Sequence, residues 1–317
     1  MENTHPDNGK PVTDFEQNLV NRIAWEAVAE QRRARRWGIF FKFFFAGYLI
    51  LFLLLYLPAS WYGGKITVGK HTALIDIEGV IGTDSEANAD YIVSGLRAAF
   101  EDKNTAGVIL RINSPGGSPV QAGYVNDEIK RLRELYPDIP LYAVIADICA
   151  SGGYYIAAAA EKIYANKASI VGSIGVIMSG FGFVDAIHKL GIERRLITAG
   201  ESKGFLDPFS PQKSEDVEHI DGVLNDVYQQ FIDVVKAGRG DRLKSDDKIF
   251  SGLIWSGEES IDLGLVDALG SAGYVAREVI GAEDIVDFTL RDTYFERFAR
   301  QVGTAVASAI SSKLELR

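Results

Sequence analysis

The chain has 317 residues, of which 47% are hydrophobic and 24% are charged, and its net charge is −10. This length allows one large domain or two small ones with appendages, and the acidic balance argues against a nucleic-acid-binding protein, because a phosphate backbone is bound by clustered Lys and Arg. The sequence holds one cysteine, Cys149, which excludes an intrachain disulfide and a zinc site made of several thiolates.

The first predicted element is an apolar helix over residues 37–62. From Phe43 the sequence reads FFFAGYLILFLLLYLPASWY, with no charged residue before Lys65. A helix of about 20 residues spans the ~30 Å hydrocarbon core of a bilayer. A buried core helix would be unusual at this length without a polar face, and a cleaved signal peptide would start nearer the N-terminus and end in small residues. The segment is therefore predicted to be a transmembrane signal anchor.

The charges that precede the apolar helix predict its orientation. Four arginines lie within the five positions from Arg32 to Arg36. Positively charged residues beside a membrane helix stay on the cytoplasmic side. Residues 1–36 are therefore predicted to be a basic cytoplasmic tail, and the chain after Trp61 is predicted to lie outside the cytoplasm.

The rest of the chain alternates between strand-like and helix-like segments. Runs rich in β-branched residues, which are typical of buried strands, occur at Thr72–Val80, Ala106–Ile112, Leu141–Ile148, Lys162–Ala165 and Arg194–Thr198. Apolar residues every three or four positions predict helices at Tyr91–Phe100, Gln121–Leu135, Val217–Val235 and Thr293–Ile310. This alternation predicts an α/β domain with mostly parallel strands, and the last helix is expected to pack on that domain or on the membrane surface.

Glycine-rich turns follow two of the predicted strands. RINSPGGSP, from Arg111 to Pro119, joins a strand to a helix. A glycine pair in such a turn leaves backbone N–H groups free beside a helix N-terminus, where they can stabilise an oxyanion, although a purely structural turn fits equally well. A third glycine-rich segment, VGSIGVI from Val171, indicates little by itself.

The second of these turns, CASGGYYIAAAA from Cys149, contains a candidate nucleophile. Ser151 is predicted at the start of a helix of small residues, where the helix dipole and free N–H groups favour a developing negative charge. The alternative is a serine that only caps the helix. The segment is not a G-x-S-x-G elbow, because Cys149 stands at the first glycine position, and this argues against an α/β-hydrolase.

A serine nucleophile needs a base. The candidate histidines are His71, His188 and His219, and none lies in a glycine-rich motif at a strand end. Lys203, in the turn-rich segment LITAGESKGFLDPFSP, is the other candidate, since catalytic residues are common in loops that follow strands. Taken alone, Lys203 fits a solvated surface lysine as well.

Six segments between Thr72 and Gly270 occur in the order found in one family of peptidases. They are NSPGG at 113–117, ASGGYY at 150–155, GSIGVI at 172–177, the SKG-to-P segment at 202–208, GRG at 238–240 and WSGEESIDLGLVDALG at 255–270. Together they resemble the signal peptide peptidase A family, whose core is similar to the Clp protease and crotonase folds. Asp147 and Cys149 differ from the small or thioether residues usual in that family before the nucleophile.

The resemblance implies a role for each motif. Ser151 would be the nucleophile, Lys203 the general base, and the N–H groups of Gly117 and Gly152 the oxyanion hole. Ser173 matches the position of a hydroxyl that orients the lysine. Lysine titrates near pH 10.4 in water, so a lysine base needs burial in apolar surroundings to be neutral near pH 7. Such surroundings also suit hydrophobic peptides.

The predicted protein is therefore a membrane-anchored serine endopeptidase that degrades cleaved signal peptides and other hydrophobic peptides. The crotonase- and Clp-protease-like α/β domain would occupy residues 63–290 and the C-terminal amphipathic helix residues 291–317. By resemblance we expect a homo-oligomeric ring on the extracytoplasmic face of the bacterial cytoplasmic membrane, with no cofactor, metal or nucleic-acid partner. The alternatives are an inactive membrane scaffold of the same fold and a crotonase-like enzyme that processes acyl-CoA thioesters.

Overall fold

The computed structural model of the protein describes residues 14–56 and 69–291. The chain divides into two compact units, Met1–Ile66 and Thr67–Arg317. Residues 57–62 of the predicted membrane segment and the predicted C-terminal helix at 293–310 lie outside the described residues.

The described part of the first unit is the helix α1 at Asp14–Tyr56. Large apolar side chains from Trp37 to Phe52 are exposed along its second half. Within residues 14–56 and 69–291, neither α1 nor any other helix combines the length with the apolar character that spanning a bilayer requires.

The second unit is built on a sheet of eight strands. The strands are β1 at His71–Glu78, β2 at Thr105–Ser114, β3 at Leu141–Ala150, β4 at Lys162–Ala165, β5 at Ile170–Gly172, β6 at Ile254–Ser256, β7 at Ala268–Leu269 and β8 at Ile285–Asp287. Their order is β6-β5-β3-β2-β1-β8, with β4 paired to β3 and to β7. Every pairing between these strands is parallel except that of β5 with β6, which confirms the predicted α/β domain.

The helices of this unit vary widely in length. Those among the described residues are α3 at Ala89–Glu101, α4 at Pro119–Leu135, α5 at Gly152–Ala157, α6 at Val184–Lys189, α7 at Ser214–Arg239, α8 at Gly257–Asp262 and α9 at Ala272–Tyr274, with 3₁₀ turns at Gly240–Arg242 and Asp247–Phe250 and a π-helical turn at Val275–Ile280. Local signals start two of them: the side chain of Asn88 accepts a hydrogen bond from the N–H of Tyr91, and Ser118 caps α4 just before Pro119.

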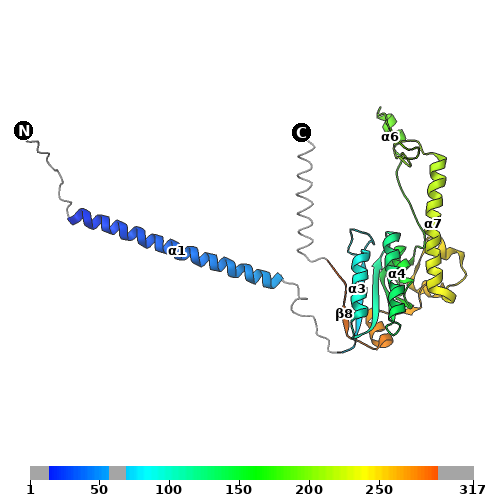
Figure 1. The fold of residues 1–317 in the computed structure, drawn as a ribbon, viewed down its shortest axis with the longest axis horizontal. Helices are drawn as coiled ribbons and strands as arrows, with labels where there is room; N and C mark the ends of the chain where they lie inside the picture. The colour runs from blue at the N-terminus through cyan, green and yellow to red at the C-terminus, as the bar shows by residue number, and fades with distance from the viewer. Residues whose placement is uncertain (1–13, 57–68, 292–317) are drawn as a thin grey trace, which may run out of the picture. The chain divides into compact units, whose positions relative to one another are not determined.

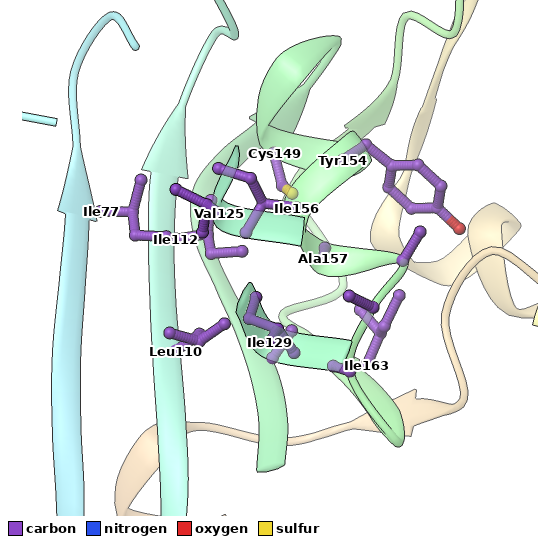
Figure 2. Close-up of a cluster of buried hydrophobic side chains, with 14 of the residues drawn as sticks. Ile77, Leu110, Ile112, Val125, Ile129, Cys149, Tyr154, Ile156, Ala157 and Ile163 are labelled. Atoms are coloured by element: carbon purple, nitrogen blue, oxygen red, sulfur yellow. The ribbon is translucent and has the colours of Figure 1, made fainter. Parts of the chain in front are cut away.

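The main core lies between the sheet and α3, α4 and α5. Figure 2 shows side chains of the central strands, among them Ile112, meeting Val125 and Ile129 of α4 and Ile156 of α5. These positions alternate along the strands and recur every three or four residues along α4, which is why the sequence pattern predicted these elements. A second cluster, which includes Tyr142, packs on the other sheet face against the π-helical turn.

The segment between β5 and α7, residues 173–213, is here called the arm. Figure 1 shows α6 at its far end, joined to the sheet by extended chain and by α7. The predicted strand at Arg194–Thr198 is wrong, because this part of the arm has no strand in the structure. A β-branched run becomes a strand only where another strand pairs with it, and Ile197 here is 96% exposed.

The C-terminal end of α7 is fixed to the core by a buried ion pair. Arg239, at the last position of α7, donates hydrogen bonds to the carbonyl of Gly264 at 2.8 Å and to the carboxylate of Asp267 at 2.9 Å. Burial alone would raise the pKa of Asp267, but hydrogen bonds from Arg239 and from the N–H of Ile163 outweigh burial and hold that pKa below its ordinary value. The ion pair therefore joins the C-terminal end of α7 to the chain just before β7.

Candidate active site

The carboxyl ends of the parallel strands β2 and β3 bring two turns together at one edge of the sheet. Ser114 of β2 is paired with Cys149 of β3, and the chain then enters the turns at 115–118 and at Ser151. A Cβ atom built on Gly116 would lie 2.6 Å from the Cβ of Ser151. The backbone of the first turn thus lies directly against the candidate nucleophile.

Ser151 has a conformation that serine rarely adopts. Its φ is 51° and its ψ is −122°, in a region that favours glycine. It precedes α5, yet its side chain makes no capping hydrogen bond. The backbone is instead held by its N–H, which donates to the carbonyl of Gly172 at 2.9 Å, and by its carbonyl, which accepts from the N–H of Tyr155 at 3.0 Å. Among the described residues, no group is hydrogen-bonded to the hydroxyl of Ser151, and the backbone of this residue is strained, which weakens the capping interpretation.

Two backbone N–H groups lie beside this serine. A Cβ atom built on Gly152 would be 3.3 Å from the backbone nitrogen of Gly117, so the two glycines approach each other closely. Within residues 69–291, neither N–H donates a hydrogen bond to another group. Gly117 has a φ of 148°, and a side chain there would collide with the carbonyl oxygen of Ile81. Such free donors suit a developing oxyanion.

Ser173 lies on the neighbouring strand end. It follows Gly172, whose carbonyl accepts the hydrogen bond from Ser151, and its own φ is 53°. Its N–H donates to the carbonyl of Leu253 at 2.7 Å. Four of the predicted site residues, Ser151, Gly117, Gly152 and Ser173, are therefore gathered at one edge of the sheet.

Lys203 lies in the arm, in a series of turns, and its side chain is exposed. Its N–H donates to the carbonyl of Gly200 at 3.1 Å. In the described part of the chain, no hydrogen bond joins its ammonium group to Ser151 or Ser173. A single chain thus brings the two serines and the two glycines of the predicted site together, but Lys203 does not contact them through a hydrogen bond.

None of the described histidines is bonded to Ser151. His71 is buried at the start of β1, at the amino end of the parallel strands, with its ring stacked 5.9 Å from that of Phe288. His188 is on α6, and His219 is on α7 with its ring 5.7 Å from that of Phe205. Within residues 14–56 and 69–291, no histidine is therefore placed as a base for Ser151 in its own chain.

Cys149 lies two residues before Ser151 and is fully buried (Figure 2). Burial raises the pKa of its thiol, so the thiol stays protonated at neutral pH. Although Cys149 adjoins the candidate nucleophile in sequence, it is a core residue.

Gly116 is a site residue that the sequence does not predict. In the motif NSPGG, the resemblance pointed only to the second glycine, Gly117. The φ of Gly116 is 102° and its missing side chain leaves room for Ser151. We expect Gly116→Ala to displace Ser151 and to lower its labelling by serine-reactive probes about 100-fold, the loss typical of a misplacement near 1 Å. Gly123→Ala on α4, where a Cβ meets nothing within 4 Å, is the matched control. Equal labelling of both variants would contradict this role.

A family model described as peptidase family S49 matches residues 133–284. The chain is 42% identical over 188 residues to a Na(+)/H(+) antiporter NhaA of Brucella abortus, a match that covers 59% of this chain and 25% of that protein. It is 31% identical over 209 residues to a putative signal peptide peptidase SppA of Enterococcus faecium, covering 63% and 60% of the two chains. It is 32% identical over 207 residues to a putative protease of Synechocystis, covering 65% and 72%.

The extent of these matches differs between the relatives. The chain spans only a quarter of the length of the antiporter and three fifths of that of the signal peptide peptidase, but almost three quarters of that of the Synechocystis protein. The family match includes Ser151, Gly152, Ser173 and Lys203.

Proposed function

Because the chain belongs to peptidase family S49, we propose that it is a serine peptidase in which Ser151 is the nucleophile and Lys203 the general base. The observation that carries the proposal is the free hydroxyl of Ser151, held in a strained backbone beside two N–H groups that have no acceptor among the described residues. A serine kept only as a helix cap would use its hydroxyl for the cap.

The proposed chemistry uses these groups in order. The neutral amine of Lys203 takes the proton of the Ser151 hydroxyl while its oxygen attacks the peptide carbonyl. The N–H groups of Gly117 and Gly152 stabilise the oxyanion of the tetrahedral intermediate. The lysine then gives its proton to the leaving amine, and water hydrolyses the acyl-enzyme by the same steps. Ser173 would orient the lysine.

We place Lys203 of one subunit at Ser151 of another in a homo-oligomer. Two features support this: Lys203 is exposed and unbonded to Ser151 in its own chain, and the arm that carries it exposes large apolar side chains, including Ile177, Phe181 and Ile197. Large apolar side chains exposed in this way favour burial against a partner. Burial would also disfavour the charged ammonium and so supply the neutral base.

The proposed substrate is a peptide, and the apolar side chains that the arm exposes would favour hydrophobic substrates such as cleaved signal peptides. The fold would be of the crotonase and Clp-protease type, which suits a site at the carboxyl ends of parallel strands.

This proposal is distinguished from an inactive scaffold and from an acyl-CoA-processing enzyme by labelling with a fluorophosphonate. We expect one label per chain, mapped by mass spectrometry to Ser151. Substitution of Ser151 by alanine should abolish both the labelling and peptide hydrolysis. Absent labelling, or a label elsewhere, would contradict the proposal.

The proposal extends to a membrane anchor at residues 37–62. It is supported by the exposed apolar half of α1 and by the arginines at 32–36 that precede it. Residues 1–36 would face the cytoplasm and the peptidase domain the outside. We expect alkaline phosphatase fused after Gly64 to be active, and protease added to spheroplasts to digest the domain. Protection of the domain in intact spheroplasts would contradict this orientation.

A further inference from the structure

The loop that carries Lys203 is a compact series of turns. The N–H groups of Lys203, Phe205 and Asp207 each donate to the carbonyl three residues earlier, at 3.1, 3.1 and 3.2 Å. Leu206 has a φ of 51°, a conformation that costs free energy for a residue with a side chain. Such a loop keeps its shape only if contacts outside it hold it there.

Asp207, which ends this loop, is bound from two sides. Its carboxylate accepts hydrogen bonds from the hydroxyl of Ser210 at 2.6 Å and from the guanidinium of Arg194 at 3.2 and 3.4 Å. The Asp207 side chain is only 10% exposed. The bonds from Ser210 and then from Arg194 hold the pKa of Asp207 below its ordinary value, so the carboxylate is charged across the neutral range.

Arg194 also lies over one ring of an aromatic pair. Its guanidinium carbon lies 5.9 Å from the centre of the Phe209 ring, within the range of a cation–π interaction. Phe209 stacks on Phe183 at 5.4 Å, and the N–H of Phe183 donates to the carbonyl of Pro208 at 2.7 Å. Arg194 therefore ties the end of the Lys203 loop to the chain that enters α6.

We infer that Arg194 and Asp207 are positioning residues, which hold the Lys203 loop in the shape that delivers the amine to Ser151. This inference rests on the proposed function. The loop contains neither strand nor helix, so its conformation depends on side-chain contacts. The geometry is directional: a planar guanidinium bound to both carboxylate oxygens fixes the angle as well as the distance at which the loop leaves the rest of the arm.

Asp207→Asn tests the inference, because it removes the charge but keeps the shape. We expect kcat to fall about 100-fold with KM changed much less, since a displaced base weakens the chemical step rather than substrate binding. The acidic limb of the pH–rate profile should also move to higher pH, because a poorly seated lysine is better hydrated. Arg194→Lys, which keeps the charge but not the bidentate geometry, should lie between this variant and the wild type.

Glu193→Gln is the matched control. Glu193 pairs with Arg195 on the same arm at 2.8 Å, but its side chain is 71% exposed, so its loss should leave kcat and the pH profile unchanged. Size-exclusion chromatography and melting temperature report assembly and folding for every variant. If Asp207→Asn does not assemble, Ser210→Ala provides the test, since it removes one bond to the carboxylate and leaves the ion pair, and a smaller alkaline shift is expected.

The outcomes separate this inference from the proposed function. A wild-type protein that neither hydrolyses peptides nor labels at Ser151 would end the proposed function itself. An active wild type with an assembled Asp207→Asn variant of unchanged kcat and pH limb would overturn only the positioning role. A fall in kcat without any movement of the limb in Asp207→Asn or Ser210→Ala would also overturn it, because general destabilisation suffices to explain that result.

Discussion

Ser151→Ala is expected to lower kcat for peptide hydrolysis by about 10⁴-fold or more, the loss typical when a serine peptidase loses its nucleophile. Labelling by a fluorophosphonate should vanish completely. The fold should be retained, because the side chain makes no capping bond and the backbone is held by hydrogen bonds to Gly172 and Tyr155 that alanine preserves. Steady-state kinetics with a hydrophobic fluorogenic peptide provides the measurement.

Ser94→Ala is the control for this substitution, since Ser94 is an exposed serine on α3 of the same unit. Its activity should equal that of the wild type. Wild-type turnover by Ser151→Ala, in a preparation freed of contaminating protease, would refute the assignment of the nucleophile.

Lys203→Met should be as inactive as Ser151→Ala when each is assembled alone, because an unactivated hydroxyl is a poor nucleophile. Co-assembly of the two variants should nevertheless restore activity. In a closed ring built from an equal mixture, about a quarter of the sites would combine an intact Ser151 from one subunit with an intact Lys203 from its neighbour. Co-expression with two different affinity tags, followed by tandem purification, isolates the mixed assemblies for kinetic measurement.

The same experiment discriminates between the two possible origins of the lysine. If Lys203 acted on Ser151 of its own chain, no site in a mixed assembly would contain both groups, and activity would stay at the level of the single variants. Assemblies of Ser151→Ala alone, passed through the same purification, define that background level.

The long elements of the second unit could be predicted from sequence because their burial is periodic. β4 was predicted with its observed bounds, and α4 and α7 to within a few residues, since one face of each is apolar. Strands β5 to β8 have only two or three residues each, too few to show a period. Their pairings, such as Ile170 with Ser256, join distant parts of the chain and depend on the assembled sheet.

The glycines and the serine of the site could be named from their motifs, whereas their conformations could not. A serine between a strand and a helix usually caps the helix, and only the positive φ of Ser151 and the missing capping bond of its side chain distinguish it. The importance of Gly116 depends on the close approach of a second turn, which local sequence does not encode. The β-branched residues at 194–198 predict a strand that does not form, because no other strand lies beside this part of the arm.

Because the thiol of Cys149 is buried, an introduced cysteine can be labelled with a dye while Cys149 stays in place. Cys149 is the single cysteine in the sequence, and burial keeps it protonated and out of reach of maleimide dyes. Glu193→Cys, at an arm position whose side chain is 71% exposed and which is not part of the apolar surface, would therefore supply the only thiol to react. Fluorescence energy transfer between donor- and acceptor-labelled chains could then follow the arms as subunits exchange, with no need for a cysteine-free background that would disturb the core beneath Ser151.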